Sequence, residues 1–212
     1  MTESLGDQSL QRLLETVAAR TSAPGGGAVT GVVAALAGAL VEMCARFSGT
    51  VLTEGTDLTR RTNVTDLAGR ADELRTRAVS LAQSDLVVYV EYMRARRAGD
   101  DGDLAAALDE AIRIPLEMAD VAVELAQIAL GLARSGNPNL RGDATAAVLM
   151  GVAAAKAAAV LAVENLSGTE GDPTLVEPKF VDPRLARAAA IVVSATTTEL
   201  DALSPYPVLR AT

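Results

Sequence analysis

The chain has 212 residues, of which 50% are hydrophobic but only 2% are aromatic. A core built mainly from Ala, Val, Leu and Gly disfavours a β-sandwich or barrel and favours long, closely packed helices. Nineteen basic and 27 acidic residues give a net charge of −8, which disfavours nucleic acid or an anionic membrane as a partner. The length suits a single domain over residues 1–212.

Chemistry that depends on histidine is excluded because the sequence contains no His. This removes His-based triads, His-ligated metals and imidazole acid/base catalysis. The lone Cys44 likewise removes an intrachain disulfide and a cysteine-cluster zinc site. Any catalysis must therefore come from carboxylates, Lys, Tyr, hydroxyls, side-chain amides or backbone groups.

The first residues are polar and acidic and lack the basic and apolar parts of a secretory signal, so we expect a cytoplasmic protein. Two apolar stretches resemble membrane spans, but residues 28–41 are too few, and residues 144–163 are mostly Ala and include Lys156. Both are predicted to be helices buried in protein, with no membrane partner.

Apolar spacing of helical period, interrupted by Gly, Pro and Asn clusters, predicts an all-α bundle of about six helices. The expected ranges in chain order are 7–20, 27–48, 57 or 65 to 98, 103–133, 143–166 and 182–203, with a linker at about 167–181.

Single residues and local composition predict where some of these helices begin, bend or become buried. Asp103 is predicted to be the N-cap of the fourth helix, and Pro115 is expected to kink that helix. The fifth helix is apolar on all sides and is therefore expected to be buried on all sides. Asp182 and Pro183 form an N-cap and first-turn pair that predicts the start of the last helix.

Small residues recur along the second helix at Gly27, Gly31 and Ala35, with Ala34 and Gly38 offset. Four-residue spacing places small side chains on one helix face. This pattern predicts close packing against a neighbouring helix or a symmetry mate.

The loop Pro24-Gly25-Gly26-Gly27 opens that helix. Its glycines allow backbone amides to face a ligand, and the start of a helix favours negative charge. The loop lacks the Lys-Ser/Thr of a nucleotide P-loop and follows a helix rather than a strand, so ATP binding is rejected. A tight connection between two helices is the alternative interpretation.

The segment APGGGAVTGVVAALAGALVEMCARFS, from Ala23, resembles the opening of the cyclodeaminase/cyclohydrolase family. That family has the fold of the C-terminal domain of formiminotransferase-cyclodeaminase and of stand-alone methenyltetrahydrofolate cyclohydrolases. Further matching motifs follow in the right order: Ser84-Asp85 with Val88-Tyr89, Ile114-Pro115-Leu116, Gly136-Asn137-Pro138-Asn139 with Asp143, and Glu164-Asn165-Leu166.

This resemblance covers about residues 10–166 and implies an all-α homodimer with long central Ala/Gly-rich helices. It also implies action on reduced folates, with no metal and no cofactor beyond the tetrahydrofolate substrate. The sequence departs from the family pattern at Ala28 and Gly142, where Ser is usual, and at Leu161, where Asn is common. Residues 48–53 replace a basic segment, which weakens the case for binding a polyglutamate tail.

Asp85 is the first candidate catalytic residue. It lies among apolar neighbours, so an inward-facing carboxyl would be desolvated and its pKa raised toward the range useful to a general base. A solvent-facing carboxylate is the alternative. Lys156 is the second candidate: it interrupts an apolar helix and is expected to pair with Asp85, Asp143 or Glu42, or to extend its ammonium to the bundle edge.

The candidate substrate-binding residues are Pro24, Gly25, Gly26, Gly27, Tyr89, Asn137, Asn139 and Asp143. Tyr89 follows Asp85 by one helical turn, where packing is its usual role. Asn137, Asn139 and Asp143 are suited to the donor and acceptor edge of a pterin, although capping of a turn and a helix is an equally good interpretation.

The function expected from the resemblance is hydrolysis of methenyltetrahydrofolate to formyltetrahydrofolate with a carboxylate base. The alternatives are a formiminotetrahydrofolate cyclodeaminase, which is an ammonia lyase, and a diverged non-catalytic helical dimer that binds folate or another ligand. A helical bundle used only for assembly is a further alternative.

Overall fold

Long α-helices make up almost all of the protein in the computed structural model, which describes residues 4–21, 23–51, 58–98, 101–167, 182–206 and 208. A short 3-10 helix, η1 (Leu5–Asp7), precedes the first of them, and a second, η3 (Pro138–Leu140), precedes α5. The α-helices are α1 (Leu10–Ala18), α2 (Gly26–Val51), α3 (Leu58–Ala98), α4 (Asp101–Ser135), α5 (Arg141–Ser167) and α6 (Pro183–Leu203).

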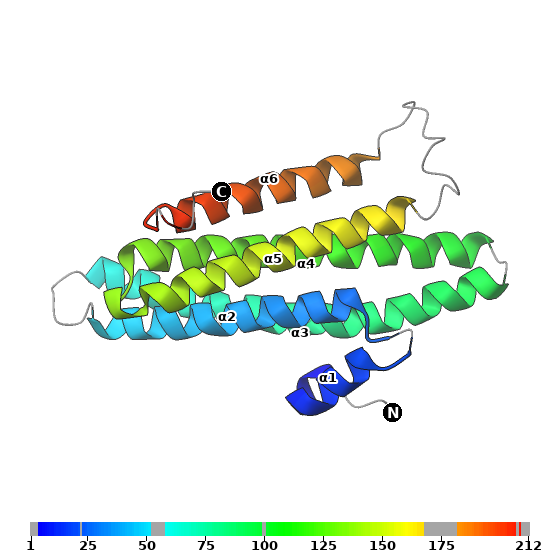
Figure 1. Ribbon diagram of the computed structural model, residues 1–212, viewed down its shortest axis with the longest axis horizontal. Coiled ribbons are helices and arrows are strands. Elements are labelled where there is room, and N and C mark those ends of the chain that lie inside the picture. Colours follow the sequence, from blue (N-terminus) through cyan, green and yellow to red (C-terminus); the bar gives the residue numbers. More distant parts are fainter. Residues whose placement is uncertain are drawn as a thin grey trace.

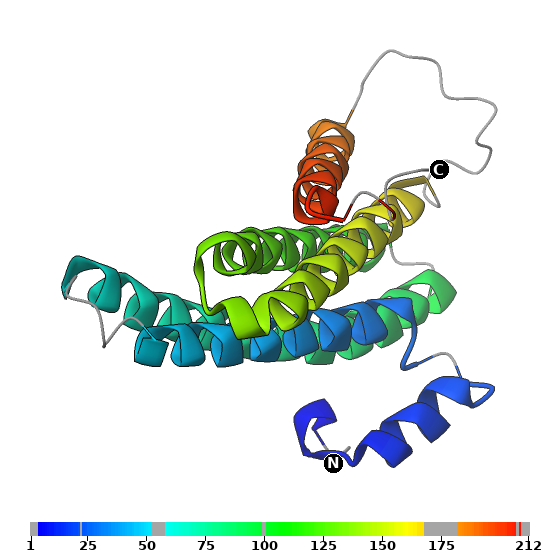
Figure 2. The same ribbon diagram turned by 60° about the vertical axis from the view of Figure 1, so that its left-hand side comes forward.

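Helices α2 to α5 run alternately in opposite directions and form a four-helix bundle (Figure 1). Helix α2 packs against α3 and α5, and α4 packs against the same two helices. Helix α6 lies over α4 and α5, whereas α1 stands apart below the bundle (Figure 2). The prediction of six helices is therefore confirmed, and no strand occurs among the described residues.

The helix boundaries agree with the sequence where the capping residues are unambiguous. The Asp182 carboxylate accepts a hydrogen bond from the Arg184 N–H at 2.8 Å, which confirms the predicted N-cap of α6. The N-cap prediction for Asp103 is wrong, because α4 already begins at Asp101 and includes Asp103. Helix α4 continues through Pro115 without a break. Most of the predicted linker, residues 168–181, lies outside the described residues.

Glycines let α2 and α3 approach closely. A Cβ atom on Gly31 would lie 2.6 Å from the Cβ of Ala82, and one on Gly38 would lie 2.9 Å from the Cβ of Arg75. Neither distance is possible for real side chains, so larger residues at these positions would push the helices apart. The small-residue pattern of α2 thus serves a contact within one subunit.

The prediction that the fifth helix is buried on all sides is wrong for this single chain. One face of α5 packs in the core, but Leu149 and Val160 on the outer face are 36% and 55% exposed. The segments Gly26–Ser48 and Pro138–Leu166 are long and apolar enough to cross a membrane by length and composition, and half of each apolar window is buried in the bundle. The rest of each window is half-buried or exposed in the part of the chain that the structure describes.

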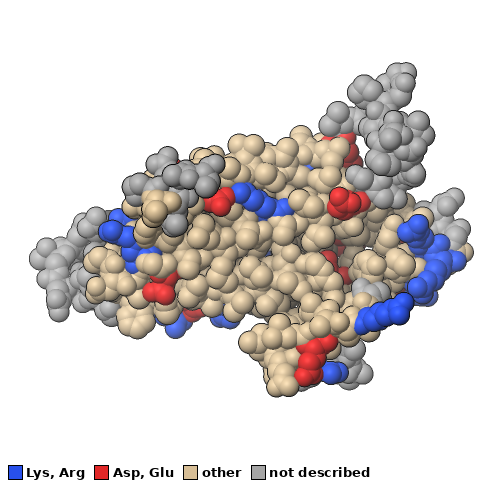
Figure 3. Space-filling model, viewed as in Figure 1, with Lys and Arg blue, Asp and Glu red and all other residues tan. Residues whose placement is uncertain are grey.

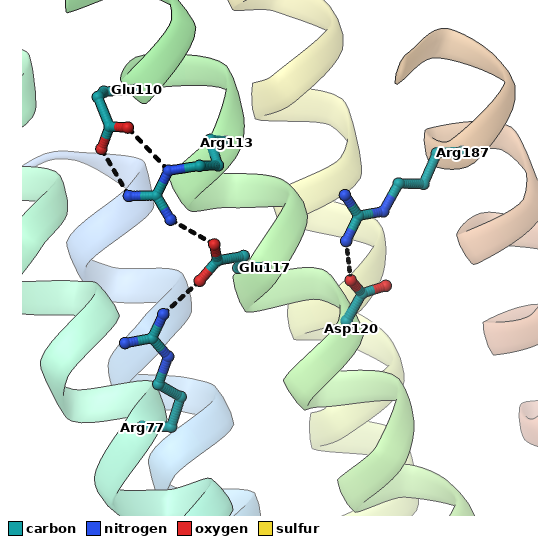
Figure 4. A network of polar contacts seen from close by, with 6 residues as sticks. All are labelled: Arg77, Glu110, Arg113, Glu117, Asp120 and Arg187. Carbon is teal, nitrogen blue, oxygen red and sulfur yellow. Dashed lines mark hydrogen bonds and ion pairs between the residues drawn. The ribbon is translucent and has the colours of Figure 1, made fainter. Parts of the chain in front are cut away.

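Ion pairs on the far side of the bundle tie α4 to its neighbours (Figure 4). Glu117 on α4 accepts hydrogen bonds from Arg77 of α3 and from Arg113, one turn earlier on α4. Asp120 pairs with Arg187 of α6. The arginines lower the pKa of Glu117 more than its burial raises it. Glu117 and Asp120 of α4 therefore face α3 and α6.

Helix α1 is held to the bundle mainly through η1. Leu5 is buried with Ala28 and Ala82, and its N–H donates to Oε1 of Gln83 at 2.8 Å. Only Leu13 of the amphipathic α1 packs against this small cluster, while Leu10 and Leu14 are exposed. The predicted range of 7–20 was too long at both ends.

Candidate functional site

The first turn of α2 encloses the carboxyl group of Asp85, which comes from α3. A Cβ atom on Gly27 would lie 2.1 Å from Oδ1 of Asp85, so the carboxyl occupies the space that any other side chain at position 27 would fill. The backbone N–H of Ala28 donates a hydrogen bond to this carboxyl. The structure thus brings together the glycine loop and the aspartate that the sequence singled out separately.

Two opposing effects act on the pKa of the Asp85 carboxyl. Burial raises its pKa above the usual aspartate value, and the hydrogen bond from Ala28 lowers it by a smaller amount. The partial positive charge at the start of a helix also favours the ionised form. The result is a desolvated carboxylate with an elevated proton affinity, as a general base requires.

The other loop residues are exposed or line a cavity between α1 and α3. Gly25 and Gly26 are exposed, and a Cβ on Gly25 would meet nothing within 4 Å. Pro24 lines a cavity of about 480 Å³ between α1 and α3, on the side of α3 that bears Gln83 and Val87. Space for a ligand therefore exists beside Pro24, and neither the glycines nor Asp85 line this cavity.

Two departures from the family pattern lie in the first turn of α2 or against it. Ala28 supplies the amide that Asp85 accepts, and Leu161 of α5 lies 3.5 Å from the position of a Cβ on Gly26. Sequence reasoning left both out of the predicted site, although the absence of the family's usual Ser and Asn at these positions was the signal that could have included them. Apolar side chains therefore occupy the first turn of α2 and the contact with Gly26, where the family usually has polar ones.

Asn137 and Asn139 lie at the other end of α2. The Asn137 N–H donates to Oγ of Ser48 at 2.9 Å, and Ser48 is in turn bonded to the Cys44 carbonyl oxygen at 2.7 Å. A rise of about 1.5 Å per residue places Ser48 about 30 Å from Gly27 along the helix. The expectation of one site that includes both the glycine loop and Asn137 does not hold within one subunit.

The asparagine turn also has the capping role that was its alternative interpretation. Oδ1 of Asn137 accepts a hydrogen bond from the Asn139 N–H at 3.0 Å, which caps η3. Asp143 follows in the first turn of α5, and its charge, together with the larger effect of burial, raises the pKa of the Cys44 thiol. Asp143 is therefore also near the end of α2, far from Asp85.

The two remaining candidates are Lys156 and Tyr89, and the structure shows the ion-pair partner of the first and the exposure of the second. Nζ of Lys156 lies 2.6 Å from Oε2 of Glu199 on α6, so its partner is none of the three carboxylates expected. Tyr89 is 41% exposed on α3, one turn beyond Asp85. Among the described residues, no group of three or more Asp, Glu or Cys side chains could hold a metal ion.

Both the sequence and the fold of this chain are similar to those of known proteins. The sequence profile of the formiminotransferase-cyclodeaminase family matches residues 9–178. The fold matches the crystal structure of a formiminotetrahydrofolate cyclodeaminase from Thermotoga maritima with a TM-score of 0.83 and 25% sequence identity, over 97% of this chain and 98% of that one. No curated protein matches the chain in sequence. The profile match spans most of the chain, and the protein belongs to the formiminotransferase-cyclodeaminase family.

Proposed function

We propose that this protein is a methenyltetrahydrofolate cyclohydrolase in which Asp85 is the general base. Family membership and fold support an enzyme that acts on one-carbon folates. The observation that carries the assignment of the base is the Asp85 carboxyl, which is half-buried against Gly27 and has a raised pKa. A carboxylate of this kind supplies the base that a protein without histidine needs.

The reaction requires water to add to the carbon that bridges two nitrogens of the methenyl cation. Asp85 accepts a proton as the new C–O bond forms, and its negative charge stabilises the cation before attack. One ring C–N bond then breaks, the released nitrogen takes a proton, and the formyl group stays on the other nitrogen. The positive end of α2 favours the oxygen atom as negative charge develops on it.

A cyclodeaminase is the alternative enzyme, and the similarity to the Thermotoga maritima formiminotetrahydrofolate cyclodeaminase favours it. In that reaction formiminotetrahydrofolate closes the same ring and releases ammonia, with the carboxyl group moving protons between nitrogens. Supplying each folate separately distinguishes the two: loss of methenyl absorbance marks the hydrolase, whereas a gain of that absorbance with ammonia release marks the lyase.

A diverged protein that binds folate without turnover is the third possibility. The apolar Ala28, whose N–H bonds Asp85, and Leu161, which lies against Gly26, favour it, since they replace groups able to hydrogen-bond a pterin or water. If calorimetry shows that folate binds but neither folate substrate is converted, the result would support a binding protein and contradict both enzymatic functions.

The decisive experiment compares the wild type with Asp85→Asn in the methenyl absorbance assay. We expect the variant to lose at least about 100-fold in kcat, the contribution typical of a general base. Asp66→Asn is the matched control, because Asp66 is an exposed carboxylate on the same helix. Wild-type turnover by Asp85→Asn would remove this residue from the mechanism.

A further inference from the structure

The cavity between α1 and α3 lies on the opposite side of α3 from Asp85. Val87 lines this cavity, whereas Asp85, two residues earlier, packs against Gly27 of α2. Successive residues of an α-helix are about 100° apart around its axis, so Asp85 and Val87 are separated by about 200°. The body of α3 therefore separates the cavity from the proposed catalytic carboxyl.

The cavity has the size and the walls of a small-molecule site. Its volume of about 480 Å³ lies within the range of about 300–1,000 Å³ that is usual for ligand pockets. It follows α3 from Gln83 to Glu91, a length of about 12 Å by helical rise. Among the described residues that line it, none is aromatic, and aliphatic side chains form much of the wall: Leu13, Pro24, Leu86, Val87 and Val90. These walls suit an alkyl chain.

Helix α1 turns a partly polar side toward this cavity. Arg12 and Thr16, which are one turn apart, line it, while Leu10 and Leu14 are 68% and 61% exposed to solvent. In Figure 3 much of the outward surface of α1, at the lower edge of the molecule, carries no charged side chain. A helix that packs directly on a core buries its apolar side. The inverted orientation of α1 suits a ligand that has a polar end.

The charges at the cavity favour an anionic end on that ligand. Nη1 of Arg12 lies 4.0 Å from Oε2 of Glu15, a long distance for an ion pair, and both side chains are exposed. Glu91 also lines the cavity, but Oε2 of Glu91 lies 3.4 Å from Nη1 of Arg94, which compensates its charge. Arg12 therefore supplies a cation that can donate hydrogen bonds to a carboxylate.

We propose that this cavity is a second small-molecule site, which binds a medium-chain alkyl carboxylate. The alkyl chain lies along the aliphatic wall of α3, and the carboxylate accepts hydrogen bonds from Arg12. Binding there is separate from the chemistry at Asp85 and does not depend on the proposed folate reaction.

Isothermal titration calorimetry of the whole protein with octanoate tests this proposal. We expect one octanoate per chain and weaker binding of octanol, which has the same chain without the charge. Arg12→Gln is expected to weaken octanoate binding about ten-fold, the value of one charge-assisted hydrogen bond, and to leave octanol binding unchanged. Arg20→Gln is the matched control, because Arg20 is exposed beyond the end of α1 and does not line the cavity.

A variant that fills the cavity tests where octanoate binds. Val87→Trp places a large side chain in the cavity and is expected to abolish octanoate binding. Because Val87 is 56% exposed, α3 should tolerate the change, and far-UV circular dichroism checks that the helix content is retained. Val193→Trp is the control and should bind octanoate as the wild type does, since Val193 is 67% exposed on α6.

Equal octanoate affinity of the wild type and Arg12→Gln, or unchanged binding to Val87→Trp, would overturn the proposed site. So would an absence of octanoate binding to the wild type. Displacement of octanoate by methenyltetrahydrofolate would overturn it too, since the cavity would then be part of the folate site. A wild-type protein that binds octanoate but does not turn over folate would contradict only the proposed function.

Discussion

The side-chain amide of Asn165 on α5 donates a hydrogen bond to the carbonyl oxygen of Ala111 on α4 at 2.7 Å. In a regular helix that oxygen would accept from the N–H four residues later, but position 115 is proline and has no N–H. Asn165 therefore replaces the donor that Pro115 lacks. Two motifs that the sequence presents separately, Ile114-Pro115-Leu116 and Glu164-Asn165-Leu166, form a single contact between helices.

Asn165→Ala is expected to lower the free energy of unfolding by about 1–2 kcal/mol, because it leaves the Ala111 carbonyl without a donor. In a Pro115→Ala background, the restored N–H bonds to that carbonyl and the same change at Asn165 should have a much smaller effect. Urea denaturation of the four proteins in this double-mutant cycle measures the coupling. Equal effects in both backgrounds would contradict the link between Pro115 and Asn165.

Gly27→Ala is expected to displace the Asp85 carboxyl, since the new methyl group would coincide with it. Overpacking of this kind lowers stability by about 1–3 kcal/mol. Displacement of the base should also reduce kcat by about 100-fold. Gly25→Ala is the control, because a Cβ there enters open space. Chemical denaturation and the methenyl absorbance assay measure the two effects, and identical behaviour of the two variants would contradict the close contact.

The raised pKa of Asp85 predicts how stability depends on pH. The folded protein holds this proton more tightly than the unfolded chain, whose aspartates titrate near pH 3.9. As pH rises from about 4 through the folded pKa, ionisation of the half-buried Asp85 therefore makes the folded state less stable. Asp85→Asn lacks this loss, so its stability relative to wild type should increase over the same interval.

Denaturation midpoints of the two proteins at several pH values test this expectation. A constant difference across the interval would indicate an unperturbed carboxyl. In the activity assay, the acid limb of the pH–rate profile should lie above the ordinary aspartate value, because the base works only when ionised.

Leu36→Lys is expected to weaken the homodimer implied by the family resemblance by at least about 100-fold, since it places an unpaired charge on an exposed apolar face of α2. Leu36 is exposed near the middle of α2, so the folded subunit should tolerate the change. Val193→Lys is the control, because Val193 is 67% exposed on α6, away from that face. Sedimentation measures both, and an equal association constant for the two variants would exclude Leu36 from an interface.

The sequence by itself determined the helices and the family. Apolar periodicity and punctuating residues such as Pro183 act within a few residues, so they predict helices without knowledge of the rest of the fold. The family resemblance, added to the apolar neighbours of Asp85, selected this residue and the glycine loop as parts of one site, and the structure brings Gly27 and Asp85 together. Local signals failed at Asp103. An aspartate can cap a helix, but α4 begins two residues earlier, at Asp101, and continues through Asp103.

Only the tertiary structure decided which groups meet. A helix pattern defines a face but not its partner, so it could not predict that Lys156 pairs with Glu199, or that Asn165 completes the hydrogen bonding at Ala111. Nor could it predict that Asn137 lies about 30 Å from Asp85's end of α2, because that separation depends on helix length and on the direction in which each helix is packed. The same packing leaves one apolar side of α2 and α5 uncovered in a single chain.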